Sequence, residues 1–136
     1  MVEIKIIYQG DLHTELTHGP SGKKIETDAP KDNQGKGEAF SPTDLVAGAL
    51  GACMITVMGI IAKRHQIKLE DAKARVLKEM SQEPVRRIGK IKVEFQMPAG
   101  IPVEKRKLLE NAAFTCPVHK SLHPDIQIPV EFFYPD

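Results

Sequence analysis

The sequence predicts an α+β fold with a largely antiparallel sheet. Three observations predict it: β-branched alternating stretches near both ends, one long uncharged helix in the middle, and an amphipathic helix between the later strands. Strands that occur in runs, instead of alternating one by one with helices, are typical of this fold class. The chain has 136 residues, of which 41% are hydrophobic and 27% charged. These are the proportions of one globular domain, so we expect residues 1–136 to form a single domain.

The N-terminal part is predicted to form an antiparallel meander. Residues 2–8 alternate apolar and polar side chains, as a half-buried strand does. Residues 9–11 are typical of a hairpin turn, and further extended stretches cover residues 12–17 and 23–27. Residues 28–40 are rich in Pro, Asn, Asp and Gly and therefore predict a long loop.

A long helix is predicted from Pro42 to about His65. Ser41 can cap it, Pro42 suits the first helical position, and Asp44 completes a pair of the capping-box type near the positive end of the helix. Residues 45–62 carry no charge, which reaches the lower length limit of a membrane span. Many of them are glycine or alanine and no second span follows, so we interpret the stretch as a buried helix. Such a helix must be covered on every side by sheet, helix or a partner subunit.

Further strands and a second helix complete the prediction. Strands are expected over residues 72–82 and 86–97, and the second of these alternates cleanly between apolar and polar residues. An amphipathic helix over residues 103–114 follows, then a new helix start at residues 116–117. The last strand is expected over residues 126–133.

Charge and cysteine content limit the partners and the compartment. Nineteen basic and eighteen acidic residues give a net charge of +1, so we expect neither nucleic acid nor a membrane as a partner. Only two cysteines are present, and the first residues lack the basic and apolar regions of a secretory signal. We therefore expect a cytoplasmic protein, in which two cysteines are free thiols, a redox pair or metal ligands.

Cys53 and Cys116 are the candidate residues for chemistry. Cys53 lies in the apolar helix, where a free cysteine is ordinarily a small buried hydrophobe. Cys116 precedes Pro117 at a helix start, where unpaired backbone N–H groups favour a thiolate. His119 follows three residues later as an acid–base candidate. Cys116, His119 and His123 also form a C-x2-H-x3-H pattern to which Cys53 could add a zinc ligand, but structural zinc motifs normally bring paired ligands from both sides, so we expect no metal.

Two segments carry a specific combination of residues. They are residues 40–53, Phe-Ser-Pro-Thr-Asp-Leu-Val-Ala-Gly-Ala-Leu-Gly-Ala-Cys, and residues 116–122, Cys-Pro-Val-His-Lys-Ser-Leu. This combination resembles the OsmC/Ohr family of osmotically induced and organic-hydroperoxide-resistance proteins. Residues 21–30 and the expected strand order are similar too, so the likeness covers essentially the whole chain. The resemblance implies an intertwined homodimer, in which antiparallel sheets from both chains surround long central helices.

The resemblance also implies a cysteine-based, peroxiredoxin-like hydroperoxide reductase of the oxidative stress response. Cys53 matches the family's peroxidatic position, where a thiolate attacks the O–O bond and becomes a sulfenic acid. Cys116 matches the resolving position and would form a disulfide with it, which an external dithiol reductant reopens. No bound cofactor is implied, and the apolar surroundings suit a hydrophobic peroxide.

The chain departs from the best-characterised members at two supporting positions. Those enzymes activate the thiolate with an Arg from the N-terminal strands, steadied by a Glu directly after the helix-opening Pro. Here Thr43 stands at the Glu position, and no arginine precedes Arg64. Asp44 and His119 are the candidate supporting residues, although Asp44 is also explained as a helix cap. The cations that could replace the missing arginine, from the same or the other subunit, are His13, His18, Lys23 and Lys24.

A non-catalytic function is the alternative. Without the arginine, the Cys53 thiolate has no evident counter-charge, which would slow its attack on a peroxide. A protein that kept the fold could instead bind a small hydrophobic ligand in an apolar pocket at the dimer interface.

Overall fold

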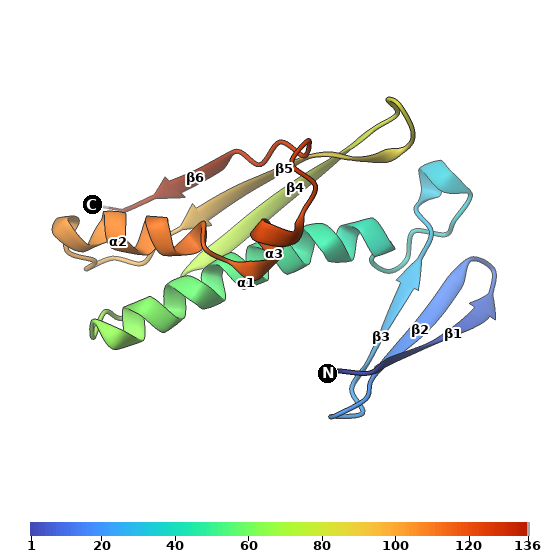
Figure 1. Ribbon diagram of the computed structural model, residues 1–136, viewed down its shortest axis with the longest axis horizontal. Helices are drawn as coiled ribbons and strands as arrows, with labels where there is room; N and C mark the ends of the chain where they lie inside the picture. The colour runs from blue at the N-terminus through green and yellow to red at the C-terminus, as the bar shows by residue number, and fades with distance from the viewer. Residues whose placement is uncertain (136) are drawn as a thin grey trace. The chain divides into compact units, whose positions relative to one another are not determined.

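The protein folds into two compact units, Met1–Val46 and Ala47–Asp136. The structure is a computed structural model that describes residues 1–135 (Figure 1). Each unit contains one three-stranded sheet. The expectation of a single domain over residues 1–136 stays a prediction.

The first unit contains the predicted antiparallel meander. Its strands are β1 (Ile4–Gly10), β2 (His13–His18) and β3 (Lys24–Asp28). The turn between β1 and β2 consists of Asp11 and Leu12, whose φ angles are 53° and 60°. Two successive positive φ values are typical of the hairpin turns whose twist matches that of the strands. The predicted loop follows β3 and contains one short 3-10 helix, η1 (Lys31–Asn33).

The helix α1 (Pro42–Arg64) begins at a reciprocal cap. The backbone N–H of Ser41 donates to Asp44 Oδ2, and the backbone N–H of Asp44 donates to Ser41 Oγ, each at 3.0 Å. Two backbone donors that the helix itself cannot pair are satisfied in this way. The predicted capping pair and the predicted start of the helix are therefore confirmed.

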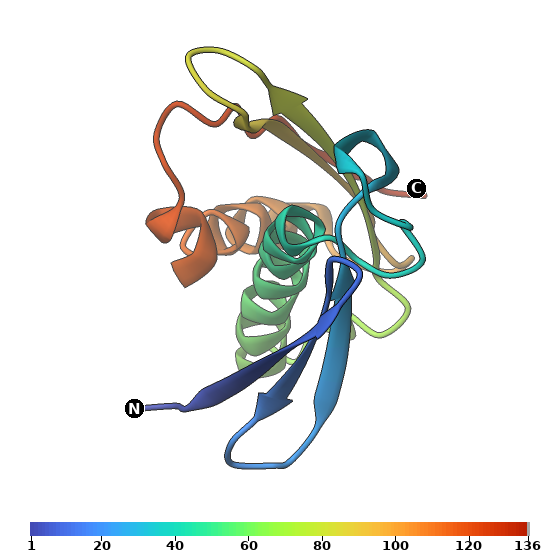
Figure 2. The same ribbon diagram turned by 90° about the vertical axis from the view of Figure 1, so that its right-hand side faces the viewer.

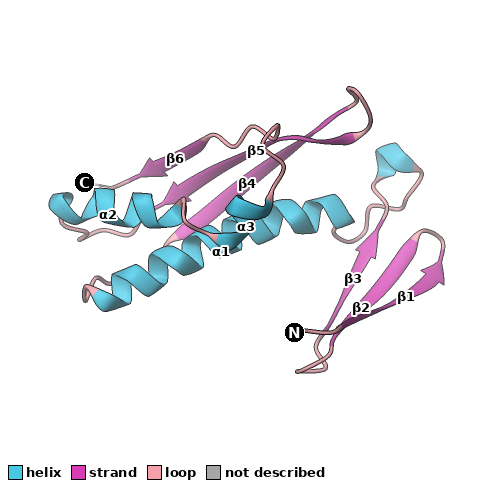
Figure 3. Ribbon diagram, in the orientation of Figure 1, coloured by secondary structure: helices cyan, strands magenta, loops and turns pink. Residues whose placement is uncertain are grey.

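The second unit packs two helices on one face of its sheet. In chain order its elements are α1 from Ala47 onward, β4 (Lys73–Ser81), β5 (Arg87–Gln96), α2 (Val103–Ala113), α3 (Pro117–Ser121) and β6 (Val130–Phe133). The strand order is β4–β5–β6, and α1 and α2 lie on the same face of the sheet in both views (Figures 1 and 2). The predicted α+β class is confirmed (Figure 3).

The last strand is shorter than predicted, and it is the parallel exception to the largely antiparallel pairing. β6 runs parallel to β5, because the chain returns to the sheet through α2 and α3, and parallel neighbours need such a crossover. The ladder begins only at Val130 instead of residue 126. Pro129 has no N–H to donate to the ladder, and before it Gln127 forms a single isolated bridge with Lys90.

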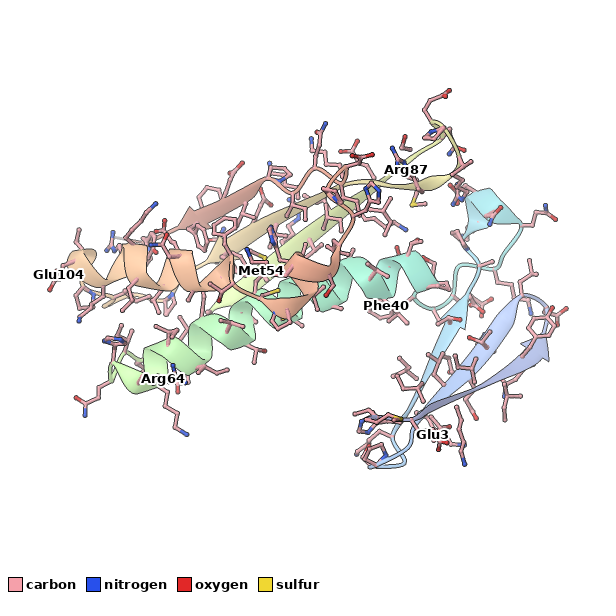
Figure 4. The ribbon with its side chains drawn as sticks, viewed as in Figure 1. Glu3, Phe40, Met54, Arg64, Arg87 and Glu104 are labelled. Atoms are coloured by element: carbon pink, nitrogen blue, oxygen red, sulfur yellow. The ribbon has the colours of Figure 1, made fainter. Side chains whose placement is uncertain are left out.

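One face of α1 builds the core of the second unit. Its buried residues recur every three or four positions: Ala47, Leu50, Gly51, Met54, Met58 and Ala62. All of these except Gly51 belong to the same apolar cluster as Ile91, Val93 and Phe95 of β5 and Leu109 of α2. Met54 lies near the middle of the helix and Arg64 at its end (Figure 4).

The rest of α1 is largely apolar but only partly covered. Its most apolar 18-residue window has a mean hydropathy of 2.3, and only 33% of that window is buried. The length and composition of the helix would fit a membrane span, but a single helix of this kind is weak evidence, because long core helices have the same properties. The predicted cover on every side is therefore not provided by the described chain alone.

Candidate functional site

Cys116 is the N-cap residue of α3. Its Sγ accepts a hydrogen bond from the backbone N–H of His119 at 3.2 Å, and Pro117 occupies the first helical position. The side chain is fully buried. The predicted position of Cys116 at a helix start is confirmed, and the backbone donor directed at the sulfur is the local environment that stabilises sulfur-centred negative charge.

The structure brings the thiol of Cys53 beside the thiol of Cys116. The two residues are 63 positions apart in the sequence. Their side chains are joined by a hydrogen bond, and both cysteines are free. Both belong to the apolar cluster of the second unit, where Cys53 is half-buried and Cys116 fully buried. Two thiols in such contact are placed for exchange between a sulfenic acid, a disulfide and a dithiol.

The electrostatics of the pair distinguish its two members. Burial raises the pKa of the Cys116 thiol, and the hydrogen bond to Cys53 raises this pKa further. The backbone N–H groups of His119 and Val118 act in the opposite direction. A hydrogen bond that favours the neutral thiol raises its pKa, so the contact with Cys53 helps to keep Cys116 protonated. The Cys116 thiol of the reduced protein therefore stays protonated at neutral pH, so the thiolate expected at this helix start is not favoured.

A series of aromatic ring contacts connects Phe95 in the core with His119. The ring of Phe95 stacks on Phe132 with centroids 5.2 Å apart, and Phe132 meets the edge of Phe114 at 6.4 Å. The His119 ring in turn stands at 90° to Phe114 at 5.8 Å. Sequence reasoning did not identify Phe114 or Phe132 as part of this region. The sequence signal that could have indicated this aromatic region is Phe114, which lies two residues before Cys116.

His119 differs from His13, His18 and His123 in its hydrogen bonding. Its Nδ1 is buried and has no hydrogen-bond partner within residues 1–135. By contrast, the Nδ1 atoms of His13, His18 and His123 each have a partner. Unpartnered buried polar atoms are rare in native proteins, so this nitrogen needs an explanation.

Asp44 and His123 each make local hydrogen bonds. Asp44 serves as the capping residue of α1 in the first unit, as described above. His123 is exposed, and its Nδ1 accepts a hydrogen bond from the backbone N–H of Asp125 at 3.0 Å. No cluster of three or more His, Cys, Asp or Glu side chains among residues 1–135 is arranged to hold a metal. The zinc alternative with Cys116, His119 and His123 is therefore not brought together.

His13, one of the cations that could replace the missing arginine, is bound to carboxylates of the first unit. Its Nδ1 lies 2.5 Å from Asp28 Oδ1 and its Nε2 lies 3.1 Å from Glu26 Oε1. The hydrogen bond to Asp28, followed by that to Glu26, raises the pKa of His13, and the same bond lowers the pKa of Asp28. Asp28 Oδ2 also accepts from the backbone N–H of Glu38 at 3.0 Å. These groups line a pocket of about 490 Å³, which the sequence did not predict.

Comparisons with known proteins agree with this architecture. The family model of the OsmC-like proteins matches residues 35–131. A crystal structure from Psychrobacter arcticus, provisionally described as an osmotic stress induced and detoxification response protein, is 44% identical, with a TM-score of 0.92 over 98% of this chain and 96% of that one. A comparison with curated proteins gives no match.

More distant structures share the fold. An organic hydroperoxide resistance protein OsmC from Legionella pneumophila is 19% identical, with a TM-score of 0.72 over 97% of this chain and 96% of that one. An organic hydroperoxide resistance protein from Elizabethkingia anophelis is 17% identical, with a TM-score of 0.78 over 98% of this chain and 96% of that one. The family match covers more than half of the chain and the Psychrobacter protein is similar over almost all of it. The chain belongs to the OsmC-like protein family.

Proposed function

We propose that the protein reduces organic hydroperoxides through Cys53 and Cys116. The observation that carries the proposal is the hydrogen-bonded pair of free thiols in an apolar cluster. Membership of the OsmC-like family suggests peroxide or stress defence as the general role. The names of the Legionella and Elizabethkingia proteins, which share the fold, refer to organic hydroperoxide resistance.

The half-buried Cys53 is the peroxidatic residue in this proposal, since a peroxide can reach it more easily than the fully buried Cys116. The Cys53 thiolate attacks the outer oxygen of the hydroperoxide, and the O–O bond breaks. The leaving alkoxide takes up a proton and departs as an alcohol, and Cys53 becomes a sulfenic acid. The Cys116 sulfur then attacks the Cys53 sulfur, which forms the disulfide and releases water. An external dithiol, and no bound cofactor, restores both thiols by two exchange steps.

The side chains around the pair favour an organic peroxide over hydrogen peroxide. The cluster that contains both cysteines consists of aliphatic and aromatic residues, with Met54 and Phe95 among those fully buried. Apolar surface of this kind gains free energy by covering an alkyl or aryl group, which hydrogen peroxide lacks. We therefore expect the two substrates to differ mainly in apparent affinity.

Peroxide consumption with a dithiol such as dihydrolipoamide tests the proposal. Wild type should consume cumene hydroperoxide faster than hydrogen peroxide, and Cys53→Ser should consume neither. Cys116→Ser should react once per chain and leave a sulfenic acid on Cys53, detectable by trapping with dimedone and mass spectrometry. Lys63→Ser, at the exposed end of the same helix, is the control. Equal rates in wild type and Cys53→Ser would contradict the proposal.

We also propose that two chains form a homodimer through the uncovered face of α1. Uncharged residues recur on that face every three or four positions, and the structure leaves them exposed: Ala49, Ala52, Thr56 and Ile60. Ile60 is 48% exposed. A long apolar face with small side chains permits close approach of another helix and gains free energy when it is covered.

Light scattering during size-exclusion chromatography tests the homodimer. Wild type should have twice the mass of one chain, and Ala52→Glu should lose this mass because it buries a charge in the interface. Lys63→Glu, at the exposed end of the same helix, is the control and should remain dimeric. A wild-type mass of one chain would rule the assembly out.

The non-catalytic alternative remains distinguishable from the proposed reduction. It predicts unreactive thiols and a small apolar molecule that copurifies with the protein. Mass spectrometry of the denatured protein would detect that molecule.

A further inference from the structure

We propose that His119 is the proton acceptor for the resolving thiol. On this proposal, its Nδ1 receives the proton of Cys116 when the disulfide forms and passes it to the leaving oxygen. The inference rests on the proposed reduction of hydroperoxides and assigns a residue to its second step.

The position of His119 in α3 couples it to Cys116. Cys116 is the N-cap, and His119 is the third residue of the helix, whose backbone N–H donates to Cys116 Sγ at 3.2 Å. In capping boxes, the side chain at this third position turns back toward the cap residue. The edge-on contact with Phe114 at 5.8 Å fixes the plane of the imidazole. The backbone of His119 thus already touches the reacting sulfur, and its ring belongs to the same turn.

The unpartnered Nδ1 provides the second, independent observation. The atom is buried within the described chain and accepts no hydrogen bond there, whereas His13, His18 and His123 all use their Nδ1. A buried nitrogen without a partner destabilises the folded protein, so its retention is explained if it binds a proton or an oxygen that is present only during the reaction. Neutral imidazole with its hydrogen on Nε2 leaves Nδ1 free as an acceptor.

The chemistry of the resolving step requires such an acceptor. Cys116 is buried and its raised pKa keeps it protonated, yet its sulfur must attack as a thiolate. The proton moves from Cys116 Sγ to Nδ1, the sulfur attacks Cys53, and the S–O bond breaks with its electron pair on oxygen. The leaving hydroxide then takes the proton from Nδ1 and departs as water. His119 is unchanged at the end, and no further reactant is consumed.

The apolar cluster that contains the two thiols offers no equivalent group among residues 1–135. Tyr134, another titratable member of the apolar cluster, already donates its hydroxyl hydrogen to Glu110 at 2.8 Å, and burial raises its pKa well above the usual range. A phenol in this state does not accept a proton near neutrality. Imidazole is the side chain whose ordinary protonation range lies near neutral pH.

The test separates the two steps in a single turnover of the reduced protein. His119→Asn keeps the backbone N–H and a polar atom near the place of Nδ1 but cannot carry a proton, and His119→Phe removes the polar atom and fills the space. His123→Asn is the matched control at an exposed histidine of the same segment. Sulfenic acid is measured by dimedone trapping after one equivalent of cumene hydroperoxide, and disulfide by the loss of free thiols, at several pH values.

We expect both His119 variants to form sulfenic acid at the wild-type rate and to form the disulfide about 10²-fold more slowly, the usual scale of a lost general base. Sulfenic acid should accumulate in them, and the pH dependence of the disulfide rate should differ from that of wild type and His123→Asn. Equal disulfide rates in wild type and His119→Phe would overturn the inference and leave the proposed function standing. Absence of sulfenic acid in wild type would overturn both.

Discussion

Replacement of Asp44 by alanine should destabilise the protein and leave peroxide reduction intact. The carboxylate accepts the backbone N–H of Ser41 at 3.0 Å, and Ser41 is only 2% exposed. Its removal leaves a buried donor without this acceptor, which costs about 1–3 kcal/mol. It also removes a negative charge from the first turn of α1, which costs about 0.3–1 kcal/mol. We therefore expect Asp44→Ala to lower the free energy of unfolding by about 2 kcal/mol.

Ser41→Ala removes the other half of the same cap. It should cost about 1 kcal/mol, the usual value for an N-cap residue. The double variant should lose less than the sum, because the two hydrogen bonds belong to one reciprocal pair. For a chain of 136 residues, 1 kcal/mol corresponds to about 3–4 °C in Tm, so Asp44→Ala should melt about 7 °C below wild type.

Urea unfolding followed by circular dichroism measures these differences, and the hydroperoxide assay is run on the same samples. Glu104→Ala is the control, since Glu104 is an exposed acid in the first turn of α2 (Figure 4) and should change stability by less than about 0.5 kcal/mol. Wild-type stability together with lost activity in Asp44→Ala would refute the reasoning. The carboxylate would then act as the supporting group that stands in for the family's glutamate.

Two further predictions concern the packing and the charges of each unit. Gly51→Ala should lower the free energy of unfolding in urea by about 1 kcal/mol, because its Cβ would lie 2.7 Å from Val76 Cγ2. Gly59→Ala has nothing closer than 4.0 Å and should raise the free energy of unfolding by up to about 1 kcal/mol through its higher helix propensity. Destabilisation by both variants to the same extent would contradict this. The His13–Asp28 pair should stabilise the protein most between about pH 4 and 6.5. Because the pKa of His13 is raised, its contribution to stability is complete below pH 6.5 and is lost as the pH rises through its pKa in the folded protein. Because the pKa of Asp28 is lowered, its contribution to stability is complete above pH 3.8 and is lost as the pH falls through its pKa in the folded protein. His13→Gln should therefore differ from wild type in free energy of unfolding at pH 5.5 more than at pH 9, and a constant difference would show that the pair is not ionic.

Local signals explain which parts of the fold could be predicted. The helix α1 begins at Pro42 as expected because Ser41 and Asp44 form the cap with neighbouring residues only. The clean alternation of β5 likewise records one buried and one exposed face, and the structure shows that alternation at Ile91, Val93 and Phe95.

Features that depend on distant partners could not be predicted in the same way. Nothing in residues 126–133 alone specifies a parallel neighbour, because the direction of β6 follows from the crossover through α2 and α3. A helix that is apolar all round also carries no periodicity to tell which face the sheet covers. The face that includes Met54 is identified only by its contacts with the core of the second unit.

The candidate site combines a local part with a part that only the fold supplies. Cys116, Pro117 and His119 lie within four residues, so their capping geometry could be expected from the sequence. Contact between Cys116 and Cys53 depends on the packing of α3 against α1. From the sequence, this contact could be predicted only through the family resemblance. The unpartnered Nδ1 of His119 is a property of packing as well, since the spacing of residues does not show which atom is buried.

The unequal environments of the two sulfurs give the proposed reaction a direction. Cys116 is fully buried and has a raised pKa, so oxidation of Cys116 first would require a peroxide to enter the closed core and displace its contact with Cys53. Cys53 is only half-buried, so a peroxide meets it first. Once Cys53 is oxidised, the proton on Cys116 is the remaining obstacle to the disulfide. A base at His119 removes that obstacle without lowering the pKa of Cys116 in the resting protein, and the resolving thiol is thereby kept reduced until it is needed.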